Sequence, residues 1–66
     1  MKIEYDRHAD AMYIRLLAGT VVESDEVRPG VVLHFDADGK VLGIEMLDVS
    51  ERIDNPRELA MELVGE

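Results

Sequence analysis

Residues 31–47 read VVLHFDADGKVLGIEML, and they give the clearest indication of a fold in the chain. Two apolar runs, Val31–Phe35 and Val41–Leu47, flank a short polar loop that has a glycine near its end. Two apolar runs around such a loop are typical of a β-hairpin. The rest of the chain is therefore interpreted as strands and turns built around this hairpin.

Pairing across the hairpin is expected to place Phe35 opposite Val41 and Leu33 opposite Gly43. One face of the hairpin then carries Glu45 together with apolar residues, namely Val31, Leu33, Phe35, Val41 and Leu47. The other face carries His34 together with Val32, Leu42, Ile44 and Met46. Because both faces are apolar, both need cover. We therefore expect a homo-oligomer, a dimer or larger, that forms through the sheet face left bare by its own chain.

Three further strands are expected before the hairpin. Lys2–Tyr5 alternates polar and apolar residues, and Ala11–Leu17 follows a polar turn. Ala18–Gly19 is expected to reverse the chain tightly into Thr20–Val27. That third strand is acidic, so we place it at a sheet edge, where charge discourages unwanted pairing. Connections this short leave no room for parallel crossovers, which predicts an antiparallel meander of four or five short strands.

One short helix is expected at the C-terminal end, over about residues 56–64. Asn55 is a good N-cap, Pro56 suits the first helical position, and Glu58 stands where a capping box needs it. An apolar stripe follows at helical spacing: Leu59, Ala60, Leu63 and Val64. A helix this short is unstable alone and must dock. The sequence thus predicts an α+β fold in a single small domain over residues 1–66.

Composition excludes several classes of function. The 66 residues include 15 Asp and Glu against 7 Lys and Arg, for a net charge of −8. The chain has no cysteine, which excludes disulfides, thiolate zinc sites and a cysteine nucleophile. Its basic residues are scattered singly, so we expect no binding to nucleic acid or to an anionic membrane. With neither a signal-like start nor a run of ~20 apolar residues, we expect a cytoplasmic protein.

Three acidic residues of the expected edge strand, Glu23, Asp25 and Glu26, are the candidates for binding a partner. They would pair with a basic surface, or the strand would lend its free edge to another chain. The alternative is a solvated edge strand whose charges only prevent aggregation.

One stretch resembles a calcium-binding loop. Counting Gly39 as its sixth position puts Asp36, Asp38 and Glu45 at ligand positions, but His34 stands where the first carboxylate belongs. The flanks alternate like strands, whereas the calcium motif needs helices. A hairpin turn is therefore the preferred interpretation.

Asp6, His8 and Asp10 could offer two carboxylates and an imidazole to a metal ion. The preferred interpretation is a polar turn whose carboxylates accept hydrogen bonds from backbone amides. We accordingly assign no metal and no cofactor.

Catalytic patterns are weak. His34 and Glu45 could form a base and the carboxylate that orients it, but strand alternation puts them on opposite faces. No Gly-x-Ser-x-Gly motif surrounds Ser24 or Ser50. We therefore expect that the protein is not an enzyme.

Several short motifs form a combined pattern. The first half contains Tyr5-Asp6, Ala9-Asp10-Ala11-x-Tyr13-Ile14 and Glu26-Val27-x-Pro29-Gly30-Val31. The second half contains Asp36-x-Asp38-Gly39 and Gly43-Ile44-Glu45-x-Leu47-x-x-Ser50. Over about residues 3–53 this pattern resembles a small bacterial family, domain of unknown function 2283. The resemblance implies a small intracellular bacterial protein with no established activity, so it assigns no functional residue.

The sequence thus favours a small acidic, non-enzymatic interaction module. An antitoxin-like partner of a small basic protein is one concrete version, based on size and charge. The alternative is a domain that binds a small ligand or metal at a subunit interface. Such a site would draw on residues with suitable side chains: Asp6, His8, Asp10, Tyr13, His34 or Glu45.

Overall fold

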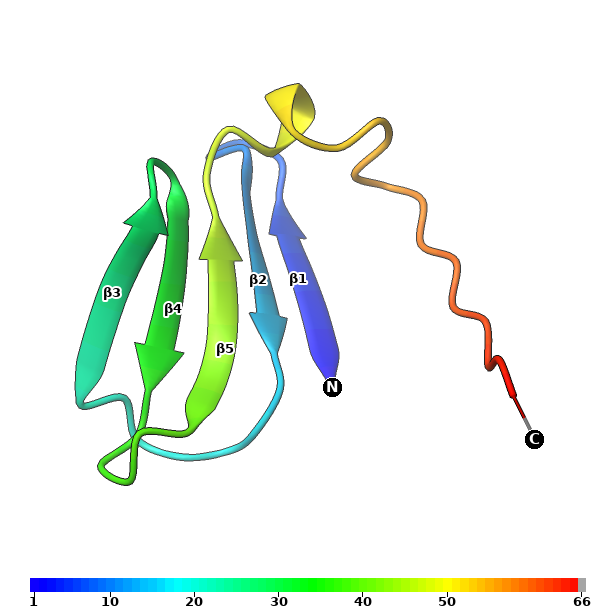
Figure 1. Ribbon diagram of the computed structural model, residues 1–66. Helices are drawn as coiled ribbons and strands as arrows, with labels where there is room; N and C mark the ends of the chain where they lie inside the picture. Colours follow the sequence, from blue (N-terminus) through cyan, green and yellow to red (C-terminus); the bar gives the residue numbers. More distant parts are fainter. Residues whose placement is uncertain (66) are drawn as a thin grey trace.

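A computed structural model describes residues 1–65 of the chain. It contains five β-strands, which are β1 (Lys2–Asp6), β2 (Ala11–Arg15), β3 (Glu23–Arg28), β4 (Val31–Phe35) and β5 (Val41–Met46). All neighbouring strands are antiparallel, in the order β1-β2-β5-β4-β3 (Figure 1). The antiparallel sheet, the hairpin of residues 31–47 and the edge position of the acidic strand are confirmed.

The connection between β2 and β3 differs from the expected meander. Ala18–Gly19 does not form a hairpin, because residues 16–22 pass the ends of β5 and β4 to reach the far edge (Figure 1). The backbone amides of Leu16 and Leu17 donate to the carbonyl of Leu42, at 2.8 and 3.1 Å, which holds the start of this connection against β5. The result is a Greek-key order. It pairs the apolar β2 on both sides and leaves the acidic β3 at the edge.

A β-bulge in the β4–β5 hairpin changes the expected register. Phe35 pairs with Val41 as predicted, but His34 pairs with Gly43, so Leu42 is an extra residue on β5. Leu33 consequently pairs with Ile44 and not with Gly43. An extra residue shifts the alternation of one strand against its partner. Every residue of β5 after the bulge therefore faces the side opposite to the expected one.

This shift gives the sheet one apolar and one polar face, so the prediction of two apolar faces is wrong. The registers place ten apolar or aromatic residues on the first face, here called the apolar face: Ile3, Tyr5, Met12, Ile14, Val31, Leu33, Phe35, Val41, Ile44 and Met46. The other side, here called the polar face, carries mostly polar residues: Lys2, Glu4, Asp6, Tyr13, Arg15, Ser24, Glu26, Val32, His34 and Glu45.

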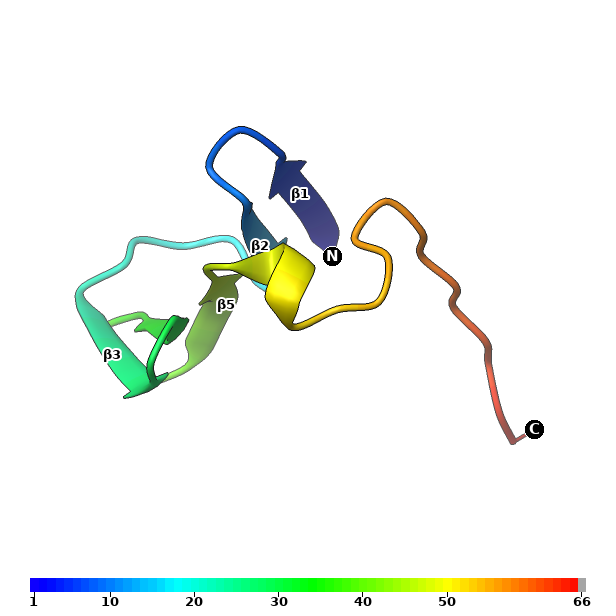
Figure 2. The same ribbon diagram turned by 90° about the horizontal axis from the view of Figure 1, so that it is seen from above.

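The apolar core is small. Within residues 1–65 the buried apolar side chains are Met12, Leu42 and Val49, and the other residues of the apolar face are only half-buried. Seen from above, the strands form one curved layer (Figure 2). Domains usually pack two layers of secondary structure around a core. The apolar face is therefore the part of this fold that is least complete.

The expected helix over residues 56–64 is not present. The helical element found in the described part of the chain is a 3-10 turn, η1 (Val49–Glu51), which buries Val49 completely. Residues 56–65 are here called the C-terminal arm. They begin with a turn at residues 56–57, and the rest of the arm leads away from the sheet without regular secondary structure (Figure 1). About nine residues cannot hold a helix without a surface to dock on. No helix of residues 1–65 is long and apolar enough to cross a membrane.

Candidate functional site

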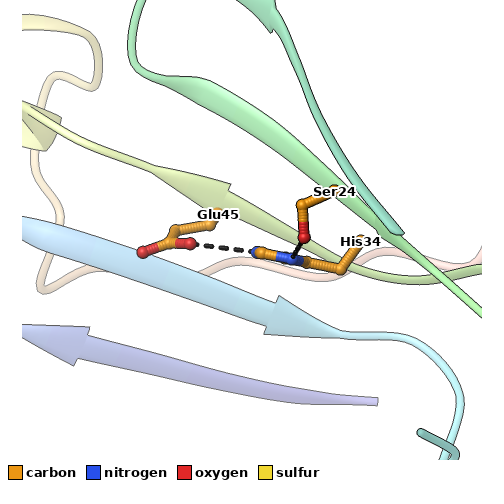
Figure 3. Close-up of polar contacts among 3 residues, drawn as sticks. All are labelled: Ser24, His34 and Glu45. Carbon is orange, nitrogen blue, oxygen red and sulfur yellow. Dashed lines mark hydrogen bonds and ion pairs between the residues drawn. The ribbon is translucent and has the colours of Figure 1, made fainter. Parts of the chain in front are cut away.

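Three side chains on the polar face form a hydrogen-bonded line across three adjacent strands (Figure 3). The Ser24 hydroxyl on β3 lies 2.7 Å from Nδ1 of His34 on β4. Nε2 of His34 lies 3.0 Å from a carboxylate oxygen of Glu45 on β5. The ring of His34 is mostly covered, with 16% of its side chain exposed, against 38% for Glu45.

The β-bulge explains why His34 and Glu45 meet. The uniform alternation assumed from the sequence puts them on opposite faces, and that prediction is wrong. With Leu42 as the extra residue, Gly43 and Glu45 share a face with His34. A glycine inside a strand pattern often marks a bulge, so Gly43 was the sequence signal that could have revealed this pairing. Sequence reasoning also missed Ser24 as the third member.

The chemistry of the three groups sets the position of the protons. A carboxylate only accepts hydrogen bonds, so Nε2 of neutral His34 donates to Glu45 and Nδ1 accepts from the Ser24 hydroxyl. When the ring is protonated, both nitrogens donate, and the Ser24 oxygen turns to accept. The line therefore ties β3, β4 and β5 together in both states.

Tyr13 extends this polar face toward β1. Its ring stacks on His34, with 5.5 Å between the ring centroids and an interplanar angle of 30°. The Arg15 guanidinium lies 5.2 Å from the centre of the Tyr13 ring and 3.6 Å from Glu4. A Cβ atom at Gly43 would stand 2.6 Å from Cζ of Tyr13, so this strand position needs glycine.

A shallow depression of about 170 Å³ lies beside this cluster, lined by Glu4, Asp6, Ala11, Met12, Tyr13 and Glu45. It opens on the β1–β2 side of Glu45, whereas Ser24 lies exposed on the edge strand β3. A serine, a histidine and a carboxylate in line are the parts of a nucleophilic relay, which also needs a substrate site at the serine. Here the depression and the Ser24 hydroxyl lie on different sides of the His34 ring, so the depression does not supply a substrate site at the serine.

Asp10 links the β1–β2 turn to η1 and does not act with Asp6 and His8. Its carboxylate accepts hydrogen bonds from the Ser50 hydroxyl at 2.7 Å, from the Ser50 amide at 3.0 Å and from the Tyr5 hydroxyl at 3.0 Å. Its backbone carbonyl accepts from the Val49 amide at 3.0 Å. The hydrogen bond from the Ser50 hydroxyl is the main cause that holds the pKa of Asp10 below its usual value. Desolvation, together with this contact to Asp10, raises the pKa of Tyr5.

The two sequence patterns that resemble metal-binding sites form turns. Asp6 accepts from the backbone amides of His8 and Ala9, at 2.9 and 3.2 Å. Asp36 accepts from the amides of Asp38 and Lys40, each at 2.9 Å, and strands stand on both sides of its loop. Among the residues that the structure describes, no three His, Asp or Glu side chains gather as metal ligands.

The candidate binding residues Glu23, Asp25 and Glu26 lie on β3, whose six residues are all exposed. Between residues 1 and 65 the ion pairs are Arg15–Glu4 and His34–Glu45. In this part of the chain, none of the three carboxylates of β3 therefore forms an ion pair. Glu26 only accepts a long hydrogen bond, 3.4 Å, from the amide of Gly30.

The chain thus has the form of a small antiparallel sheet module with a charged edge. A comparison with protein families matches residues 2–50 to the family described as Protein of unknown function (DUF2283). The protein therefore belongs to the DUF2283 family. No curated protein and no solved structure matches the chain.

Proposed function

We propose that this protein is a small acidic, non-enzymatic interaction module that binds a basic protein through β3. One observation carries the proposal: β3 is an exposed edge strand whose three carboxylates form no ion pair within residues 1–65. An unpaired strand edge offers backbone hydrogen bonds to an added strand, and its charges select the partner.

The placement of the charges suits an added strand. Glu23 and Asp25 pair with Phe35 and Leu33, so they lie on the apolar-face side, while Glu26 lies on the polar face. A basic strand beside β3 would meet a carboxylate on either face, because its side chains also alternate. An antitoxin-like role, in which the module masks a small basic protein, is the most concrete form of this proposal.

The proposal is tested by capture of tagged protein from a lysate of the source organism, followed by intact-mass analysis. The test variant combines Glu23→Lys, Asp25→Lys and Glu26→Lys. The matched control combines Asp38→Lys, Glu51→Lys and Asp54→Lys, which changes the net charge equally at exposed sites outside β3. We expect a stoichiometric basic protein with the wild type and the control, and none with the β3 variant. Equal capture by all three proteins would contradict binding at β3.

A second candidate function is favoured by the Ser24–His34–Glu45 line. Tyr13, His34 and Glu45 lie together on the polar face, and Asp6 lines the adjoining depression. A subunit placed over this face would complete a site for a small ligand.

A ligand at a hundred times its Kd adds ~2.7 kcal/mol of stability. A thermal-shift screen of metals and metabolites should then find a rise in Tm that His34→Ala abolishes and His8→Ala retains. A flat response would count against this candidate.

A further inference from the structure

We propose that residues 56–64 of the C-terminal arm fold into a helix on the apolar face of a second copy of this chain. The exchange is mutual, so each copy gives an arm and receives one. This inference does not depend on the basic partner of β3, because it concerns the apolar face and the opposite edge of the sheet, at β1.

The first observation is the exposure of the arm. Its four large apolar side chains are among the most exposed in the described chain: Leu59 at 72%, Met61 at 75%, Leu63 at 89% and Val64 at 88%. Leu59 and Leu63 are four positions apart, as are Ala60 and Val64. These four positions form one stripe only in a helix. An extended chain would instead put Leu59, Met61 and Leu63 on one side.

The second observation is that the start of the helix is already built. The side-chain oxygen of Asn55 accepts a hydrogen bond from the Arg57 amide at 3.1 Å. The Asn55 carbonyl accepts from the Glu58 amide, also at 3.1 Å, and the Asn55 side-chain amide lies 3.4 Å from the Glu58 carboxylate. The first of these contacts is that of an N-cap, and the second closes a first turn. What the single chain lacks is a surface that would let the helix continue.

The third observation is a groove on the apolar face, which the first residues of the arm already line. It has a volume of about 240 Å³ and is lined on the sheet side by Ile3, Met12, Ile14 and Met46. Ile53, Pro56 and Leu59 line its other wall. Most of the apolar face remains half-buried. A second layer of secondary structure is what such a face needs.

The direction of the arm indicates that the second layer comes from another copy. Both views show the arm leaving past β1 and away from its own sheet (Figures 1 and 2). Met61 to Val64 therefore reach beyond the edge of the sheet that carries them. Two copies related by a two-fold axis beside β1 would each receive the other arm on the apolar face. Such a mutual exchange closes the assembly at two chains.

The test uses the full chain with two single substitutions in the arm, Leu63→Asp and Met61→Asp. Both sites are exposed in the single chain, so neither substitution disturbs its fold. Only Leu63 belongs to the helical stripe. Mass by light scattering and helix content by far-UV circular dichroism are followed from about 1 to 100 µM, a range that covers micromolar affinities.

We expect the wild type and Met61→Asp to form dimers whose helix content rises with concentration. Leu63→Asp should raise the dimer dissociation constant by about 100-fold or more, because each dimer buries this residue twice. A wild-type monomer with constant helix content would show that no second copy receives the arm and would overturn the inference. Dimers unaffected by Leu63→Asp would place the interface elsewhere. Equal loss in both variants would mean that the arm docks as a strand. Both of these results would also overturn the inference.

Discussion

At the scale of single residues, Asp10 is the position where most contacts converge. It adopts a left-handed conformation with φ of 52°. It also accepts hydrogen bonds from Val49 and Ser50 of η1, which lie 39 and 40 positions further along the chain. Asp and Asn are the side chains that tolerate this conformation best after glycine. Asp10→Asn therefore keeps the backbone while removing the charge that accepts from Ser50 and Tyr5.

The pKa of Asp10 is lowered in the folded chain, which fixes the sign of its pH effect. Ionised Asp10 stabilises the fold above the pKa of the unfolded state, about 4. This contribution is lost as the pH falls through the lower folded pKa. We expect Asp10→Asn to lower the urea midpoint at pH 7, and the gap from the wild type to narrow below about pH 4. Asp38→Asn, whose carboxylate accepts no hydrogen bond among the described residues, is the control and should show no such gap. A gap that stays constant with pH would contradict the role of the charge.

Gly43 is a second residue whose identity has a specific structural cause. A methyl group there would stand 2.6 Å from Cζ and 2.7 Å from Cε1 of Tyr13. We expect Gly43→Ala to destabilise the protein by about 1–3 kcal/mol through this overpacking. In a Tyr13→Ala background the same substitution should cost much less, as measured by a double-mutant cycle from urea unfolding. Equal costs in both backgrounds would show that the Tyr13 ring is not the reason for glycine.

At the scale of elements, the polar line across β3, β4 and β5 holds the edge strand. β3 has no buried residue, so its side-chain anchor on the polar face is the contact of Ser24 with His34. We expect Ser24→Ala to cost about 0.5–1.5 kcal/mol and to raise hydrogen exchange in β3 more than in β1 and β2. Ser24→Thr, which keeps the hydroxyl, should restore the protection. Uniform acceleration over the whole sheet would contradict a local anchor.

The strands could be located from the sequence, but their neighbours could not. Alternation and turn residues identified the hairpin of residues 31–47, and acidic side chains placed residues 20–27 at an edge. Alternation says which residues share a face of one strand, and it does not say which strand lies beside it. The pairing of β2 with β5 and the long connection over residues 16–22 were therefore missed.

The candidate site shows the same limit. His34 and Glu45 could be named as a pair by residue type, yet one extra residue at Leu42 reversed the face assigned to Glu45. The contact of Asp10 with Ser50 spans 40 positions, and no local pattern announces it. The helix over residues 56–64 has its cap and its stripe, but its formation depends on a surface that the sequence does not specify.

At the scale of the whole molecule, two surfaces of opposite character remain open. The β3 edge is acidic, and the apolar face is incompletely covered by its own chain. Charge pairs weaken in salt, because the Debye length falls to about 3 Å at 1 M, whereas burial of apolar surface does not depend on charge. We expect about 1 M NaCl to release the basic partner and to leave the dimer intact. Capture and light scattering in the same buffers check this. Loss of the dimer before the partner would contradict the assignment of the two surfaces.

In the proposed dimer, one chain completes the core of another. Nuclear magnetic resonance of a mixture of ¹³C-labelled and unlabelled full-length chains tests it most directly, through isotope-filtered nuclear Overhauser effects. We expect contacts between chains that join the methyl groups of Leu63 and Val64 to those of Ile3, Ile14 and Met46. If those methyl pairs give contacts only within one chain, or none in either case, the claim is contradicted.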